Sequence, residues 1–158
     1  MQAAVQIAIL SQATTDAAIL AHVRQTLEEF ALPSVERLID QRDGLAQTVA
    51  ALEADGVVIF IVANSTATPL STVIAGLTTK PVLAVPLEGA DLPPLQALQT
   101  TLQGGGAPVA SLAIGKAGAI NAALMAVAIL ANTDAGLRQK LHLFRETQTN
   151  KVLADRLE

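Results

Sequence analysis

Apolar runs of strand length alternate along this chain with amphipathic runs of helix length, and this alternation constrains the fold more than any other feature. The run VVIFIV at 57–62 is continuous and rich in β-branched residues, which is typical of a central strand buried on both faces. Weaker runs of the same kind lie at 5–10, 34–40, 82–85 and 109–114. Residues with helical spacing fill the intervals. The pattern therefore predicts βαβ units and a parallel sheet.

Five strands separated by helices predict a three-layer α/β/α domain with a parallel sheet of flavodoxin-like order 2-1-3-4-5. The 158 residues, of which 51% are hydrophobic, suffice for one core, and no linker or internal repeat divides them. Ala-Leu-Pro at 31–33 is expected to end the first helix and Gly56 the second. Pro69 and Pro93 stand where later helices are expected to begin.

The last segment predicts a long amphipathic helix over 133–158, after a core domain over 1–132. Thr133 or Asp134 is its expected N-cap. Its apolar stripe consists of Leu137, Leu141, Phe144 and Val152. Such a helix packs either on a neighbouring subunit or on its own sheet, and the sequence leaves both open.

The stretch LAIGKAGAINAALMAVAILA at 112–131 carries one charge and is long enough to span a membrane. It follows earlier βα units, however, and Gly115 and Gly118 divide it, so we expect a short strand followed by a buried helix. The pattern GxxxxGK[ST] fails here, because Ala110 replaces the first glycine and Ala117 replaces the hydroxyl residue. The sequence gives no support for ATP or GTP binding.

Composition excludes several classes of partner. A net charge of -4 without a run of basic residues argues against nucleic acid and against an anionic membrane surface. The chain has no Cys, which removes disulfides, thiol nucleophiles and zinc-thiolate sites. Trp and Tyr are also lacking, which disfavours a flavin carrier. The first residues lack the pattern of a secretory signal, and we expect a cytoplasmic protein.

Ligands of such sheets bind at the carboxyl ends of the strands, so the loops to search are 11–16, 40–44, 63–69, 86–94 and 115–118. The run NSTAT at 64–68 offers hydroxyls to a polar ligand, or these residues simply cap the helix that begins near Pro69. Lys116 is suited to an anion or to a neighbouring subunit, and the sequence does not choose between them.

The acidic residues and histidines give weaker signals. Asp16, Asp40 and Asp43 are imaginable as a magnesium cluster, but helix capping and turn formation explain them equally well, and no metal site is expected. His22 and His142 stand mid-helix, where surface or packing roles are expected.

Three segments resemble the PurE family, the class I carboxyaminoimidazole ribonucleotide mutases of purine biosynthesis. They are TLEEFALP, TTKPVLAVPL and the C-terminal PVASLAIGKAGAINAALMAVAILA with LRQKLHLFRETQTNKVL, so the resemblance covers nearly the whole chain. It implies an enzyme without cofactor that moves a carboxylate from an exocyclic nitrogen to a ring carbon. It also implies a homo-octamer with sites shared between subunits, and a His that handles the proton.

The departures from the family fall on the site loops. The family's GSxSD is here LSQATTD, in which Ser11 and Asp16 survive, and its SAHR is IDQR, which keeps Arg42 for a phosphate but has Gln41 at the catalytic His. Gln does not exchange a proton near pH 7. In the family's GGxAHLPG loop, Ser65 and Thr66 replace the glycines and Pro69 a second His. The fourth loop, NGLDSL-like in relatives, reads PPLQAL.

Two hypotheses follow from this distribution. The first is a PurE-like protein without mutase activity that keeps the octameric scaffold for assembly or for a small phosphorylated or polar ligand. Its candidate ligand-binding residues are Ser11, Asp16, Gln41, Arg42, Asn64, Ser65 and Thr66. The second is a divergent, working mutase in which Asp16, with a pKa raised by burial, replaces the lost His.

Overall fold

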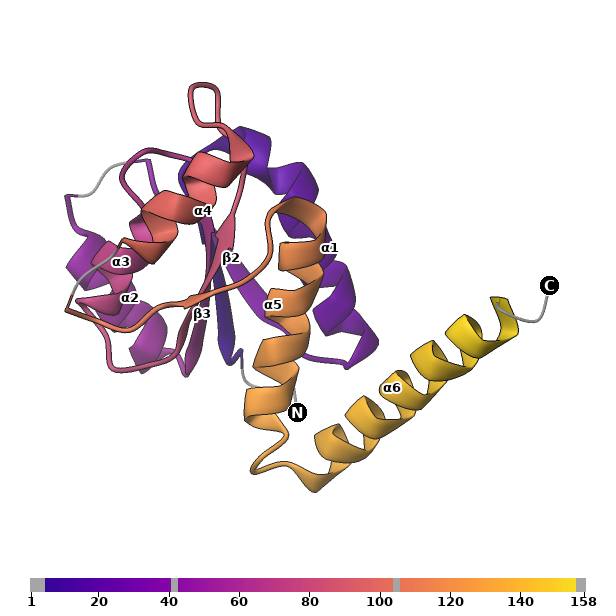
Figure 1. Ribbon diagram of the computed structural model, residues 1–158. Helices are drawn as coiled ribbons and strands as arrows, with labels where there is room; N and C mark the ends of the chain where they lie inside the picture. The colour runs from indigo at the N-terminus through magenta and orange to yellow at the C-terminus, as the bar shows by residue number, and fades with distance from the viewer. Residues whose placement is uncertain (1–4, 41–42, 104–105, 156–158) are drawn as a thin grey trace.

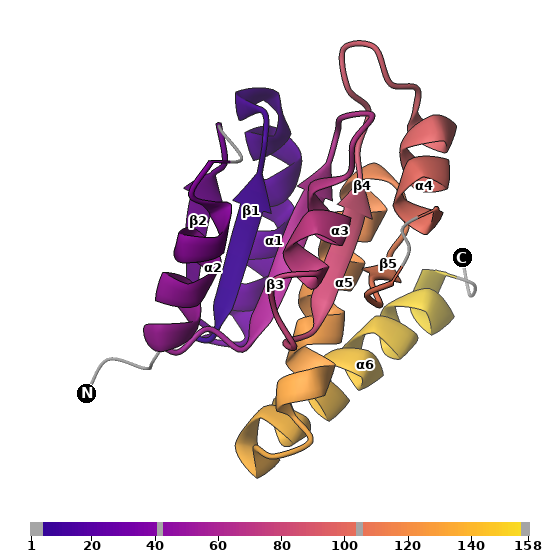
Figure 2. The same ribbon diagram turned by 90° about the vertical axis from the view of Figure 1, so that its left-hand side faces the viewer.

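The computed structural model describes residues 5–40, 43–103 and 106–155. Its centre is a five-stranded sheet in the order β2-β1-β3-β4-β5, and every neighbouring pair is parallel. Figure 2 shows the strands in this order. The strands are β1 (Ile7–Ser11), β2 (Ser34–Leu38), β3 (Ile59–Asn64), β4 (Val82–Pro86) and β5 (Ala110–Ser111). The predicted flavodoxin-like order is therefore confirmed.

Helices cover both faces of the sheet and complete three layers (Figure 1). α2 (Leu45–Ala54), α3 (Leu70–Ala75) and α4 (Pro94–Leu102) lie on one face. α1 (Ala17–Glu29) and α5 (Gly115–Leu130) lie on the other, and a 3₁₀ turn, η1 (Thr14–Asp16), precedes α1. The last helix is α6 (Ala135–Asp155).

The central strand β3 is buried along its whole length because both of its faces are covered. Ile59 and Ile61 pack into the core beneath α1 and α5, whereas Phe60 and Val62 pack into the core beneath α2 and α3. Alternate residues thus enter opposite cores, and neither face can be polar. This is why the strand appears in the sequence as a continuous apolar run.

The end of α1 is a Schellman motif, in which the N–H of Leu32 donates to the carbonyl of Leu27 and that of Ala31 to the carbonyl of Glu28. Ala31 occupies the left-handed position, with φ of 58°, that glycine usually fills. Pro33 follows directly. The helix end predicted at Ala-Leu-Pro is therefore confirmed, at the cost of one strained alanine.

The run 112–131 forms α5 from Gly115 onward, so the predicted buried helix is confirmed. The short strand expected at its start is wrong, because β5 ends at Ser111 and residues 112–114 are the loop that leads into the helix. Gly118 is required for the close approach of helix and loop, because a Cβ atom there would lie 1.6 Å from the carbonyl oxygen of Ala113. Alanines on the inner face of α5 then pack against the sheet and α1. Among the described residues, no helix is long and apolar enough to cross a membrane.

Two predicted strands are shorter in the structure. The run 109–114 yields only Ala110–Ser111, because β5 is an edge strand that pairs with β4 alone and then leaves the sheet. After Ser111 the N–H of Leu112 makes one further bond, to Ala84, before α5 begins. The run 34–40 is a strand only as far as Leu38, although the N–H of Ile39 still donates to the carbonyl of Ser11.

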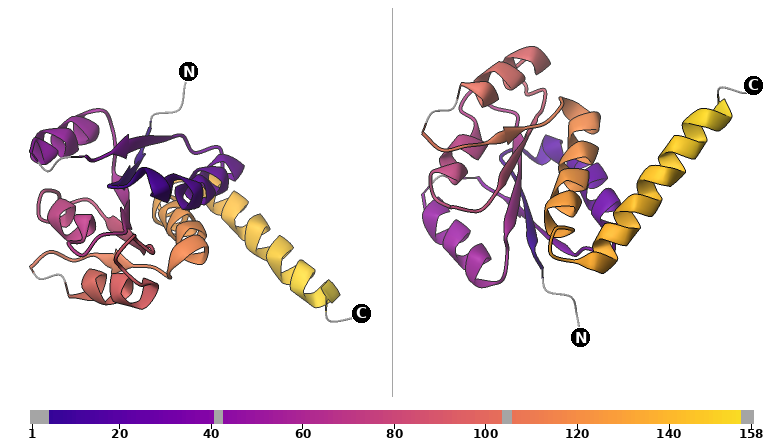
Figure 3. Two further views of the ribbon diagram at one scale, coloured as in Figure 1. Left: turned by 90° about the horizontal axis from the view of Figure 1, so that it is seen from above. Right: turned by 60° about the horizontal axis from the view of Figure 1, so that its bottom comes forward.

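The C-terminal helix α6 projects away from the body of the molecule (Figures 1 and 3). Asp134 is its N-cap, since the carboxylate accepts a hydrogen bond of 2.9 Å from the N–H of Leu137. Leu137 and Leu141 are buried against the core, and Phe144 contacts Phe30 with ring centroids 5.5 Å apart. Beyond this point the described part of the helix is exposed.

Candidate functional site

Three loops meet at the carboxyl edge of the sheet and form a cavity of about 350 Å³. They follow β1, β3 and β4 and lead into η1, α3 and α4, respectively. The lining residues are Ala13, Thr15, Ser65, Thr66, Ala67, Gly89, Ala90, Asp91 and Leu92. We call this cavity the loop pocket. Because the β1, β3 and β4 ends are adjacent only in the folded sheet, its walls come from three distant parts of the sequence.

The innermost contact of the site joins Asp16 to Ser65. The Ser65 hydroxyl donates a 2.9 Å hydrogen bond to Oδ2 of Asp16, and both side chains are buried, with 6% and 3% of their residues' surfaces exposed. Burial raises the pKa of Asp16, and the hydrogen bonds from Ser65 and with the Ala13 backbone oppose that increase. Ser65 lines the loop pocket, whereas Asp16 lies behind it.

A second contact joins the same two loops nearer the surface. The Thr66 hydroxyl lies 2.9 Å from Oε1 of Gln12 and 3.0 Å from the carbonyl oxygen of Thr68. Gln12 follows β1 directly, so the end of β1 is connected to the loop after β3 twice, by Thr66 and by Ser65. The structure thus brings Asp16, Ser65 and Thr66 together, as their positions at strand ends predict.

The third wall of the loop pocket approaches too closely for any residue but glycine. A Cβ atom on Gly89 would lie 1.9 Å from the carbonyl oxygen of Ser65 and 3.0 Å from its carbonyl carbon. The Gly89 N–H and carbonyl pair with Leu92, which closes a narrow turn above β4. Sequence reasoning included this loop in its search but did not identify Gly89, since one glycine in a loop does not reveal what it touches.

Asn64 ends β3 and is fully buried, but its side chain is turned away from the loop pocket. It bonds instead to Ser71 in α3 and to Thr101 in α4. The residue that the sequence groups with Ser65 and Thr66 as a possible ligand contact is therefore part of the supporting structure. Alternate residues of a strand point to opposite sides, which separates Asn64 from Ser65.

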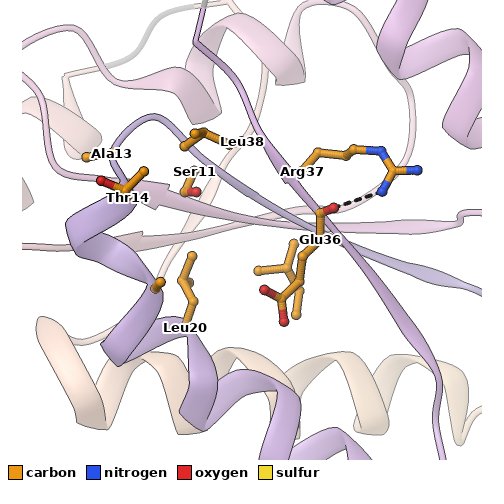
Figure 4. Close-up of a pocket in the computed structure, with 9 residues that line it drawn as sticks. Ser11, Ala13, Thr14, Leu20, Glu36, Arg37 and Leu38 are labelled. Atoms are coloured by element: carbon orange, nitrogen blue, oxygen red, sulfur yellow. Dashed lines mark hydrogen bonds between the residues drawn. The ribbon is translucent and has the colours of Figure 1, made fainter.

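Ser11 lines a different cavity of about 220 Å³, on the α1 side of the sheet (Figure 4). Its neighbours there include Thr14, Leu38 and Glu36. Arg37 reaches back to the carbonyl oxygen of Glu36 at 2.9 Å, while the Glu36 carboxylate is paired with Arg24 at 2.7 Å. The structure thus separates Ser11 from the Asp16 and Ser65 pair.

The remaining sequence candidates are not part of the described site. Gln41 and Arg42 fall outside the described residues. His22 is half-buried in α1, and His142 and Lys116 are exposed on α6 and α5. Within 5–40, 43–103 and 106–155, no group of three or more His, Asp or Glu side chains could hold a metal ion.

A sequence model of the AIR carboxylase family matches residues 6–151. The chain therefore belongs to this family, which is the PurE family that the sequence resembles.

Curated relatives match over almost the whole length. The chain is 37% identical to the N5-carboxyaminoimidazole ribonucleotide mutase of Haemophilus influenzae over 157 residues, which cover 97% of this chain and 96% of the relative. It is 35% identical to the enzyme of the same name from Escherichia coli over 94% of this chain and 90% of the relative. The crystal structure of Treponema denticola PurE superposes with a TM-score of 0.81 over 95% of both chains, at 19% identity, which supports the fold.

Proposed function

We propose that this PurE-family protein binds a small polar or phosphorylated ligand in the loop pocket and does not perform the proton transfer expected of a mutase. The observation that carries the proposal is the chemistry of the pocket wall. Its polar groups are the hydroxyls of Thr15, Ser65 and Thr66, the backbone and the exposed carboxylate of Asp91, and the remaining side chains of the lining are those of alanines and Leu92. No lining residue is a histidine. Both histidines of the chain lie on other elements, α1 and α6.

Isomerisation of the substrate named by the relatives needs a group that exchanges a proton near neutral pH. Hydroxyl groups such as those of Ser65 and Thr66 donate and accept hydrogen bonds but do not titrate in this range. The sequence adds Gln41 at the position where the family has its catalytic His. These features favour ligand binding over catalysis, with the hydroxyls orienting the ligand.

The test is to incubate the purified protein with N5-carboxyaminoimidazole ribonucleotide and to follow the ring-carboxylated isomer, with the H. influenzae relative as positive control. Calorimetry with ribose 5-phosphate measures binding in parallel. We expect no isomer above the spontaneous background, and saturable binding that Thr66→Val weakens. Thr79→Val is the matched control, because Thr79 is exposed and lies outside the loop pocket. Specific turnover by the wild-type protein would overturn the proposal.

A second candidate function is a working mutase with Asp16 as the proton carrier. It is favoured by the raised pKa of Asp16, which brings a carboxyl group closer to the pH at which a proton can be exchanged. Because Asp16 lies behind Ser65, the Ser65 hydroxyl would have to connect it to the substrate. If turnover is found, Asp16→Asn should abolish it, and an active Asp16→Asn enzyme would exclude this mechanism.

We further propose that α6 packs on a neighbouring subunit within a homo-octamer. The projecting helix carries large apolar side chains that the isolated chain leaves in water, namely Leu143, Val152 and Leu153. A groove of about 380 Å³ runs between the end of α1 and α6. Exposed apolar surface of this kind is typical of a subunit contact.

Sedimentation velocity tests this assembly. Leu143→Glu places a charge on α6, and Leu95→Glu is a matched control on α4, because both leucines are 64% exposed. We expect an octameric wild type that Leu143→Glu dissociates and Leu95→Glu does not. A monomeric wild type would refute the proposal.

A further inference from the structure

The side-chain amide of Asn64 forms hydrogen bonds with two helices. Its Nδ2 donates to Oγ of Ser71 at 2.7 Å and to Oγ1 of Thr101 at 3.0 Å, and its Oδ1 accepts from the backbone N–H of Ser71 at 3.2 Å. Asn64 and Ser71 have no exposed surface and Thr101 has 3%. Three of the four bonds available to an amide are therefore made in a buried environment.

The direction of these bonds is determined by the partners. The Thr101 hydroxyl donates to the carbonyl of Ala97 at 2.8 Å, so its oxygen is free to accept from Asn64. The backbone N–H of Ser71 can only donate, so it must face Oδ1 rather than Nδ2. Only one orientation of the amide satisfies both helices, and a buried amide that loses its partners costs about 1–3 kcal/mol.

We define the clamp as Asn64, Ser71 and Thr101. Its residues belong to β3, α3 and α4, the elements that adjoin the loops after β3 and β4. The loop of residues 65–69 begins directly after Asn64 and leads into α3, whose second residue is Ser71. The loop of residues 87–93 leads into α4, which carries Thr101. These loops supply most of the lining of the loop pocket. The Asn64 side chain thus links β3 to α3 and α4, the helices that follow the two loops of the pocket wall.

We propose that Asn64 is a positioning residue for the loop pocket, holding the 65–69 loop through Ser71 and Thr101 so that the Ser65 hydroxyl reaches Asp16. Ser65 adjoins Asn64 in the chain, and its own carbonyl is in close contact with Gly89 of the other wall. A displacement of Asn64 therefore moves Ser65, the next residue of the chain, and with it the hydrogen bond to Asp16. The proposal concerns the pocket of the proposed function, but its test needs no ligand.

If Asn64 only stabilised the core, replacing it would lower the free energy of unfolding without changing the pKa of Asp16 in the folded protein. If Asn64 positions Ser65, replacing it must also raise the pKa of Asp16, because the hydrogen bond from Ser65 lowers the pKa of that carboxyl. The pKa of Asp16 is thus a readout that separates the two roles.

The experiment is a carbon-detected NMR titration of the Asp16 carboxyl in the full-length, ligand-free protein. Ser65→Ala defines the shift that loss of the direct bond produces. We expect Asn64→Leu to raise the pKa of Asp16 by the same amount, and the double variant to show no further rise. Thr101→Val, which removes one acceptor from the amide, should raise it in the same direction by a smaller step.

Thr26→Val is the matched control, because Thr26 is also a buried threonine whose hydroxyl bonds to the carbonyl four residues earlier, that of His22. It lies in α1 outside the clamp, and we expect no change at Asp16. An unchanged Asp16 pKa in folded Asn64→Leu, or a double variant in which the two shifts add, would overturn the proposal. If Asn64→Leu does not fold, an unchanged pKa in Thr101→Val overturns it.

Discussion

Substituting Ala for Gly118 tests the close packing of α5 against the loop before it. Helix propensity alone predicts a gain of about 1 kcal/mol for a glycine replaced by alanine in a helix. The structure predicts the opposite, because the new Cβ would lie 1.6 Å from the carbonyl oxygen of Ala113 and 3.3 Å from Cγ1 of Val85. Relief requires the backbone to move by more than an ångström.

Overpacking a core typically costs about 1–3 kcal/mol, and an overlap with backbone belongs at the upper end because no rotamer change relieves it. After subtraction of the helix propensity, we expect Gly118→Ala to lower the free energy of unfolding by about 2 kcal/mol. Gly136→Ala, in the first turn of α6, is the matched control. There the nearest atom to a new Cβ is Oδ1 of Asp134 at 3.4 Å, which is an ordinary contact.

Urea denaturation followed by circular dichroism measures both variants. We expect the midpoint to fall for Gly118→Ala and to be unchanged or slightly higher for Gly136→Ala, with equal slopes. If Gly118→Ala matched or exceeded the wild type, the close approach of Ala113 to α5 would be wrong.

Three further substitutions have defined outcomes. Ala31→Gly should stabilise the chain by about 0.5–1 kcal/mol in urea denaturation, because glycine accepts the left-handed backbone, with φ of 58°, at which alanine is strained; a loss would contradict the assigned helix end. Asp134→Ala should cost about 1 kcal/mol through loss of the N-cap of α6, visible as a lower Tm. Asp16→Asn should be more stable than the wild type at pH 7. Burial raises the pKa of Asp16 above that of the unfolded chain, so the wild type loses stability as pH rises between the two pKa values, and the variant should lack that slope.

The strands of this fold are predictable where both faces are buried. A strand such as β3 is apolar along nearly its whole length. The bounds of the run VVIFIV, 57–62, lie within two residues of those of the observed strand. β5 is different, because an edge strand ends where its one partner ends rather than where its apolar residues stop. The register of β5 with β4 is a property of the folded sheet, and it cannot be predicted from the residues of the run 109–114.

The site was predictable only in part, for a similar reason. Ser65 and Thr66 are candidates because they follow a strand, and Asp16 because it lies in such a loop and matches the family's GSxSD motif; parallel strands bring their carboxyl ends to one edge. Gln12 and Gly89 were missed, since a lone amide and a lone glycine give no signal until the loops are placed together. Asn64 was grouped with the wrong set, because its hydrogen-bond partners belong to α3 and α4, and only the fold places these helices beside it.

The sequence by itself determined the class of fold, the order of its elements and the family, because periodicity and turn residues act locally and the packing segments have retained their pattern. Only the tertiary structure decided which polar side chains share a pocket. The hydrogen bond from Ser65 to Asp16 and the clamp from Asn64 to Thr101 join residues 49 and 37 positions apart. Such contacts depend on how helices and strands pack. The sequence around a hydroxyl or an amide does not indicate which distant residue will become its hydrogen-bond partner.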